Sequence, residues 1–286
     1  MKILSFGEVL WDVYPDEKFL GGAPLNFAAH CVKCGLSAGM LTAVGNDELG
    51  KATVKAINSL NVNTELVSVS EKQTGRCLVT LDKNRVPSYN LLDDVAYDHI
   101  PYAEDISGYD FLYFGTLALR SNGNFKVLEK LIKENSFEEI VVDLNLRSPH
   151  YSSRSVNFAL SNAGIVKISD EELPEVMEII GERFNGCTNA ARRLCEEYPG
   201  IKLLLITLGP DGAFVYRSST GEFFYQPGEK VTVKSTVGAG DSFTAAFISH
   251  YLAGKSISES LKTAVKLTAY VVSQIDAIPD YDKNHI

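Results

Sequence analysis

The sequence predicts an α/β protein with a mainly parallel central sheet and helices on both faces. Short runs rich in β-branched and aromatic residues alternate with stretches of helical periodicity along most of the chain. Several of these runs are apolar throughout, as is typical of strands buried on both faces. Such alternation implies parallel strands joined by helical crossovers. The predicted strands are Lys2–Phe6, Ala38–Val44, Phe111–Phe114, Ile140–Asp143, Ile165–Ile168 and Leu203–Thr207.

Helices are predicted between these strands from apolar spacing and from residues that start or stop helices. Pro24 suits the first turn of a helix that Gly35 ends, and Ser256 with Glu259 forms a capping box before the last helix. The predicted helices are Pro24–Lys33, Asp47–Leu60, Asn124–Asn135, Ser153–Ser161, Glu171–Ile180, Thr188–Tyr198, Ser242–Leu252 and Ile257–Gln274.

One segment, Gly75–Ile100, contains only strand patterns. Arg76–Leu81 and Pro87–Leu92 alternate apolar and polar residues around a turn at Asp82–Arg85, which predicts a half-exposed hairpin. A hairpin inserted in a βα series is either a lid over an active site or a surface hairpin without function. A second short hairpin is predicted at Gly221–Gly228.

Composition excludes several classes of protein. The chain has 286 residues, of which 45% are hydrophobic and 22% charged, so it can bury a large core. Its net charge of -9 disfavours nucleic acid as a partner. Glu8 and Asp12 interrupt the N-terminal apolar run, and no run approaches the roughly 18 residues of a membrane span. We therefore expect a cytoplasmic protein. Of the five cysteines, Cys31 and Cys34 form a CxxC without a second pair, so we expect reduced thiols and not a zinc site.

The run Thr236–Phe243 holds the most informative motif, Gly238-Ala239-Gly240-Asp241. Small residues before a helix aim bare N–H groups at an anion, and the helix dipole adds partial positive charge. A carboxylate beside that anion is explained if it takes a proton from a group that attacks the anion, as in phosphoryl transfer. The alternative is an ordinary turn in which Asp241 is the helix N-cap.

Other polar loops follow predicted strands, at the edge where open α/β sheets bind ligands. The loops contain paired hydrogen-bonding groups for a hydroxylated ligand, an arginine for phosphate, and carboxylates suited to Mg²⁺ through water. They are Gly7–Asp12, Gly21–Ala28 with Asn26, Asp143–Arg147, Ser169–Glu172 and Thr207–Gly212.

These motifs resemble the ribokinase-like (PfkB-type) carbohydrate kinases from Gly7 to about Pro279. Gly21–Ala28 and Gly238–Asp241 match the family's two signatures at the expected ends of the chain. Further motifs are similar to those of fructokinases: Gly7-Glu8 with Asp12, Gly21–Pro24, Val95–Ile100, Gly115–Ala118 and Asp143-x-Asn145-x-Arg147.

The resemblance implies a three-layer α/β/α fold in one domain, residues 1–286, with a β-strand lid from segments of about 12–22 and 72–100. It implies ATP and Mg²⁺ as cofactors and pairing of lids in a homodimer. Among the site residues, Asp241 would be the base, with an anion hole at Gly238, Ala239 and Gly240. The other implied contacts are Asp12, Gly22, Asn26 and Arg147 for the substrate, Ser169, Thr207, Gly209 and Gly212 for the nucleotide, and Glu172 for the metal.

Three residues depart from the family's pattern. Ser235 replaces a common Asp of a monovalent-cation site, and Asp276 stands near that loop where Gly is frequent, so activation by K⁺ stays open. Ser169 replaces the usual Asn before Glu172, which weakens the expected Mg²⁺ network without removing it. None of the three touches Asp241 or the anion hole.

The implied activity is phosphorylation of a primary hydroxyl of a free sugar, with D-fructose favoured. Ribose and 2-keto-3-deoxygluconate remain alternative substrates, and a non-catalytic sugar sensor on the same fold is the rival of another class. The chain lacks the GxGxxG of dinucleotide-binding dehydrogenases after its first strand and the GxxxxGK[ST] of P-loop kinases.

Overall fold

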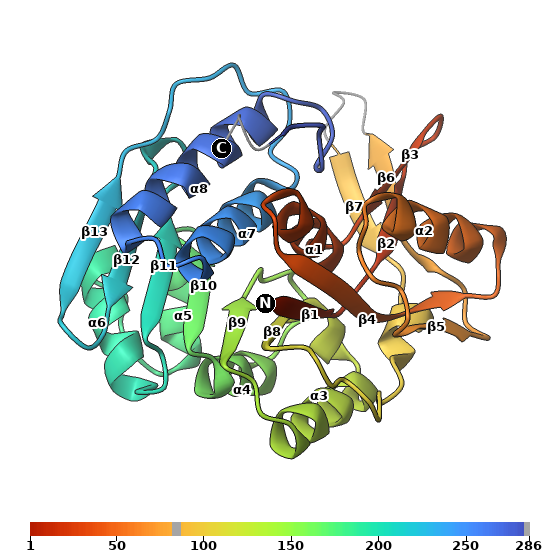
Figure 1. Cartoon of the computed structure of the whole chain (residues 1–286), viewed down its shortest axis with the longest axis horizontal. Helices are drawn as coiled ribbons and strands as arrows, with labels where there is room; N and C mark the ends of the chain where they lie inside the picture. The colour runs from red at the N-terminus through yellow and green to blue at the C-terminus, as the bar shows by residue number, and fades with distance from the viewer. Residues whose placement is uncertain (82–86, 283–286) are drawn as a thin grey trace.

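The computed structural model describes residues 1–81 and 87–282, and a large sheet forms its centre (Figure 1). Seven neighbouring strands of the described sheet run parallel, and two antiparallel strands extend one edge. In spatial order they are β13 (Glu222–Gln226), β12 (Ala213–Arg217), β11 (Leu203–Thr207), β10 (Ile165–Ser169), β9 (Glu139–Asp143), β8 (Phe111–Phe114), β1 (Lys2–Phe6), β4 (Ser37–Gly45) and β5 (Val67–Ser70).

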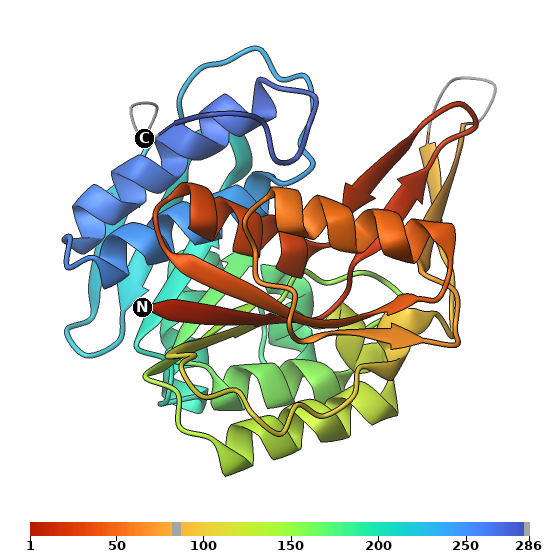
Figure 2. The same cartoon turned by 45° about the vertical axis from the view of Figure 1, so that its right-hand side comes forward.

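Helices cover both faces of this sheet, which gives the three layers that the sequence predicts (Figures 1 and 2). Neighbouring strand residues point to opposite faces, so Ile3 packs in the core beneath α1 and α7 while Leu4 packs in the core of the other face. One face carries α1 (Ala23–Lys33), α2 (Glu48–Ser59), α7 (Ala239–Leu252) and α8 (Ile257–Val272), and the other carries α3 (Asn122–Glu134), α4 (Ser153–Asn162), α5 (Leu173–Ile179) and α6 (Cys187–Glu197). Short 3₁₀ turns are η1 (Ala96–His99), η2 (Leu117–Arg120) and η3 (Gly209–Asp211).

A second, smaller sheet projects beyond the main one (Figure 2). Its described strands lie in the order β3 (Lys18–Gly21), β2 (Leu10–Val13), β6 (Gly75–Leu81) and β7 (Pro87–Leu91). Parallel pairing of β2 with β6 joins the segment after Glu8 to the predicted hairpin. The predicted turn at Asp82–Arg85 lies outside the described residues.

All the predicted strands and helices occur, with ends shifted by a few residues, and the capping box of Ser256 and Glu259 is confirmed. The hairpin predicted at Gly221–Gly228 is wrong in extent: β13 is its second strand, and the first is β12, which begins at Ala213. The sequence also gave no signal for β5, because this edge strand is only partly buried.

The start of α7 corrects one interpretation of Asp241. The helix begins at Ala239, three residues earlier than predicted, and Gly238 is its N-cap with a left-handed φ of 78°. Asp241 therefore lies inside the first turn and is not the N-cap. Glycine suits the N-cap here because residues with a side chain rarely adopt this backbone conformation.

Candidate active site

The carboxylate of Asp241 and the amide of Asn26 meet where α7 and α1 begin. Asn26 Nδ2 donates a 2.8 Å hydrogen bond to Asp241 Oδ2. Both side chains are buried, with residue exposures of 3% for Asn26 and 9% for Asp241. The two signature motifs, far apart in the sequence, are thus in direct contact.

Burial, and after it the nearby charge of Asp143, raise the pKa of Asp241 from 3.8 to about 6. The hydrogen bond from Asn26 and the positive charges of Lys167 and Arg147 act in the opposite direction. At neutral pH the carboxylate is therefore mostly ionised, yet basic enough to accept a proton.

The turn that starts α7 holds Gly238 and Gly240 at positions that a larger residue would disturb. A Cβ on Gly238 would stand 2.7 Å from the carbonyl oxygen of Ala277, in the C-terminal segment. A Cβ on Gly240 would stand 3.0 Å from Lys167 Nζ. The Ala239 N–H donates to the carbonyl of Thr236 at 3.2 Å, so an incoming anion would share or replace that bond.

Glu8 and Gly22 form a second wall beside Asn26. The buried Glu8 carboxyl accepts a hydrogen bond from the backbone of Ala23, the first residue of α1. A Cβ on Gly22, whose φ is 113°, would stand 2.5 Å from the Glu8 carbonyl oxygen. Burial, with a smaller contribution from the charge of Asp241, raises the pKa of Glu8 to about 7. Among the described residues, Glu8 Oε2 and Asn26 Oδ1 are buried without a hydrogen-bond partner.

Asp12 reaches the site from the small sheet. It stands opposite Cys77 in the β2–β6 pairing, and the two side chains are hydrogen-bonded. Burial raises the pKa of Asp12, while the charge of Arg147 lowers it. The charge of Arg147 also lowers the pKa of Glu8 and of Asp241. This exposed arginine is therefore a cation close to several acidic side chains of the site.

Glu172 joins the loops that follow β9 and β10. Its Oε1 accepts the Leu146 N–H at 2.6 Å, and its Oε2 accepts the Ser169 N–H at 2.8 Å and hydroxyl at 2.9 Å. The next strand, β11, is paired in register, so Thr207 lies opposite Ser169. Beyond it, Gly209 has φ 53° with open space around its Cα, and Gly212 has φ 100° against the Gln226 carbonyl.

Sequence reasoning missed a buried ion pair beside the predicted base. Lys167 Nζ lies 3.2 Å from Asp143 Oδ1, with side-chain exposures of 8% and 1%. Asp143 belongs to the predicted loop Asp143–Arg147, and Lys167 belongs to none of the predicted motifs. A lysine within the otherwise apolar run Ile165–Ile168 was the available signal, because a buried lysine is rare unless it is paired.

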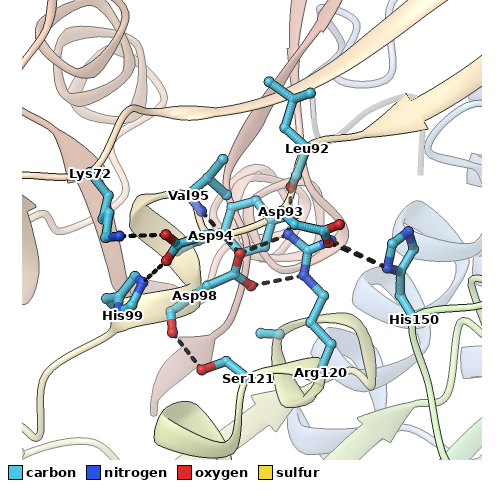
Figure 3. Close-up of polar contacts among 12 residues, drawn as sticks. Lys72, Leu92, Asp93, Asp94, Val95, Asp98, His99, Arg120, Ser121 and His150 are labelled. Carbon is cyan, nitrogen blue, oxygen red and sulfur yellow. Dashed lines mark hydrogen bonds and ion pairs between the residues drawn. The ribbon is translucent and has the colours of Figure 1, made fainter.

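A separate polar cluster lies where β7 leads into η1 (Figure 3). Arg120 donates two hydrogen bonds of 2.8 Å to Asp98 and one of 2.7 Å to the Leu92 carbonyl, and its Nη1 lies 3.2 Å from Asp93 Oδ1. His150 contacts the same guanidinium at 3.4 Å. The cluster borders a cavity of about 400 Å³. None of these residues belongs to the predicted site, and the contacts tie the exit of the small sheet to the main body.

Residues 1–81 and 87–282 contain no group of three or more His, Cys, Asp or Glu arranged to hold a metal. The five cysteines are free thiols. No described helix has both the length and the apolar character needed to cross a membrane.

The three-layer α/β/α fold is that of the ribokinase-like carbohydrate kinases, which are phosphotransferases. The model of the pfkB family carbohydrate kinases matches residues 3–284, and the chain belongs to this family. The chain is 27% identical to the ATP-dependent 6-phosphofructokinase of Thermoanaerobacterium thermosaccharolyticum over 97% of its own length and 90% of the relative's. It is 28% identical to the probable chloroplastic fructokinase-6 of Arabidopsis thaliana, over 99% of its own length and 81% of the relative's.

A solved structure agrees with this placement. The chain matches an uncharacterised sugar kinase from Pyrococcus horikoshii in complex with ATP with a TM-score of 0.84 and 27% identity, covering 99% of this chain and 96% of the other. The ribokinase-like fold that the sequence predicts is thus confirmed.

Proposed function

We propose that the protein transfers the γ-phosphoryl group of ATP to a primary hydroxyl of a free sugar, with D-fructose converted to fructose 6-phosphate as the first candidate. The observation that carries this proposal is the buried Asp241 carboxylate, held by Asn26 at the N-terminal turn of α7. Membership of a carbohydrate kinase family and a relative solved with ATP support both the reaction type and the donor.

The chemistry follows from this arrangement. Asp241 takes the hydroxyl proton while the sugar oxygen forms a bond to the γ-phosphorus, and the bond from phosphorus to the ADP oxygen breaks. The turn of Gly238, Ala239 and Gly240, at the positive end of the helix dipole, stabilises charge that develops on the transferred group. Arg147 is the cation that neutralises phosphate oxygens.

The sugar would lie between the small sheet and the start of α1. Asp12 and the backbone at Gly22 bind hydroxyls, and Asn26 contributes the Oδ1 acceptor that otherwise stays unpaired among the described residues. The unpaired Oε2 of Glu8 offers one more position for a hydroxyl. Buried polar atoms without partners are costly, so a hydroxylated ligand would recover this energy.

The nucleotide and its metal would lie on the other side of Asp241. Ser169, Thr207, Gly209 and Gly212 border the nucleotide, and the open space at Gly209 leaves room for it. Glu172 already accepts three hydrogen bonds from the protein, which fits a Mg²⁺ ion held through water and not by direct ligation. Bound Mg²⁺ would neutralise charge on the phosphates.

The same proposal extends to the small sheet, to cation dependence and to location. The β2, β3, β6 and β7 sheet acts as a lid over the sugar, within a single kinase domain, and pairs with a second copy in a cytoplasmic homodimer. The Ser235 hydroxyl accepts the Val237 N–H at 3.2 Å and brings no carboxylate to the loop, so we propose that K⁺ is not required.

An ADP-release assay over a panel of acceptors tests the proposal. The panel contains fructose, ribose, 2-keto-3-deoxygluconate, fructose 6-phosphate and 5-dehydro-2-deoxygluconate, each with Mg²⁺ and with or without K⁺. We expect the highest kcat/KM with fructose and no effect of K⁺. A preference for fructose 6-phosphate or for a sugar acid would replace fructose as the proposed substrate. If none of the acceptors in the panel supported ADP release, the proposed sugar kinase activity would be overturned.

A further inference from the structure

The ion pair of Lys167 and Asp143 lies directly beneath the first turn of α7. The two residues face each other across neighbouring parallel strands, β10 and β9. Removing both charges from water costs several kcal/mol for each ion, and such pairs are often replaceable by apolar residues without loss of stability. The need for a stable core therefore does not explain why the pair lies at this position.

Two contacts connect the pair to α7. A Cβ on Gly240 would be 3.0 Å from Lys167 Nζ and 3.8 Å from Asp143 Oδ2, so the pair fills the space beside Gly240 that a side chain would need. One helical turn later, the Thr244 hydroxyl lies 3.5 Å from Asp143 Oδ2 and 2.9 Å from the Gly240 carbonyl oxygen. The pair therefore touches the helix on both sides of Asp241.

The two charges of the pair act on Asp241 in opposite directions. Asp143 disfavours the ionised Asp241 carboxylate and Lys167 favours it. Asp241 also faces Asn26 from α1 and Arg147 from the loop after β9. Two further titratable groups that interact with Asp241 are Glu8, after β1, and Tyr113, on β8.

We propose that the Lys167–Asp143 pair positions the catalytic turn. The pair holds Gly240 and Thr244 in place, so that the anion hole and the Asp241 carboxylate keep their geometry. The opposite effects of its two charges on Asp241 offset each other. Both residues act through the turn, so they are positioning residues and not catalytic ones. The inference rests on the proposed kinase function and adds residues that the motifs did not include.

Three charge-removing variants test the proposal: Lys167→Gln, Asp143→Asn and the double variant. In each single variant we expect kcat to fall by about 10- to 100-fold, as for small misplacements of catalytic groups, with KM for ATP and sugar within a few-fold of wild type. The acid limb of the kcat/KM profile moves to higher pH in Lys167→Gln and to lower pH in Asp143→Asn. In the double variant the limb returns close to the wild-type position, and kcat stays at least about tenfold low.

Arg120→Gln is the matched control, because it breaks a similarly buried pair with Asp98 away from α7. It should lower the melting temperature and leave the acid limb in place. Where a single variant does not fold, the uncharged double variant carries the test. A folded double variant with wild-type kcat, or folded single variants with unshifted limbs, would overturn the proposal.

A readout without turnover separates this inference from the proposed function. The ¹³C NMR titration of the Asp241 carboxyl should shift in opposite directions in the two single variants, even if the acceptor is misassigned. If Asp241→Asn abolishes activity while the pair variants match the wild type, the function stands and the positioning role fails. If no acceptor is phosphorylated but the titration shifts, the function fails alone.

Discussion

The side-chain amide of Asn26 donates a hydrogen bond of 2.8 Å to the carboxylate of Asp241. This bond joins the first turns of α1 and α7, which come from opposite ends of the chain. It occupies one oxygen of the predicted base and fixes its orientation. The Oδ1 atom of the same amide has no partner in the described residues, so Asn26 links base and sugar in our proposal.

Replacing Asn26 by alanine should affect both partners. The lost hydrogen bond normally lowers the pKa of Asp241, so the acid limb of kcat/KM should move to higher pH. The lost acceptor should raise the sugar KM by about 10-fold, the factor that corresponds to one hydrogen bond of about 1.4 kcal/mol. Steady-state kinetics from pH 5 to 9 check this, with the exposed Asn189→Ala as control; an unchanged sugar KM would contradict the role of Asn26.

The activity should depend on pH through Asp241. Burial raises the pKa of this carboxyl from 3.8 to about 6. A protonated carboxyl cannot take the hydroxyl proton, so kcat/KM should fall about tenfold per pH unit below about 6 and level off above it. A profile measured at saturating ATP and Mg²⁺ checks this. A limb near pH 4 would indicate an Asp241 more exposed to water than in this structure.

Glu8 should make the folded state less stable as pH rises. Its pKa rises from an ordinary value of 4.5 to about 7 in the fold, so between these two pH values the folded protein binds more protons than the unfolded chain. The contribution of Glu8 to folding stability is complete below about pH 4.5 and is lost as pH rises through 7. Glu8→Gln should flatten this part of the melting-temperature profile, measured by calorimetry. An equally steep profile in the variant would assign the effect to another group.

Two glycines that flank α7 offer a matched pair of substitutions. Gly238 and Gly254 have φ of 78° and 83°, so alanine strains both by roughly 1 kcal/mol. Only at Gly238 does the new Cβ meet Ala277, whose carbonyl oxygen would be 2.7 Å away; Gly254 has nothing within 4 Å. Gly238→Ala should therefore lower kcat by 10-fold or more, by the order of effect expected for a displaced catalytic group. Gly254→Ala should change only the melting temperature, and equal kcat in both variants would exclude a role for the turn.

The sequence predicted the parts of the fold that leave a periodic pattern. Apolar strands such as Lys2–Phe6 and capped helices such as Ile257–Gln274 are determined locally, and they occur close to the predicted positions. The half-exposed edge strand Val67–Ser70 is determined by pairing with β4, which local pattern does not reveal.

The candidate site likewise has features that the sequence predicts and features that it does not. Glycine turns and polar loops after strands predict Asp241 and Asn26 as site residues, because such loops meet at one edge of a parallel sheet. The structure brings these two residues into contact. The pairing of Lys167 with Asp143 depends on the register between β10 and β9, and the contact of Glu172 with the Leu146 N–H depends on two loops meeting. These relationships exist only in the folded chain.

The most direct test of the central claim is sugar-dependent ADP release by Asp241→Asn. The pKa of Asp241 rises from 3.8 to about 6 in the fold, so keeping this carboxyl ionised in the folded protein costs roughly 3 kcal/mol. The wild-type protein therefore loses this amount of folding stability as pH rises through 6. At pH 8 the asparagine variant should therefore melt at a higher temperature than the wild type. We expect its turnover to be lower by about 10²- to 10⁴-fold, the contribution of a general base. Turnover close to wild type in this folded variant would contradict the account.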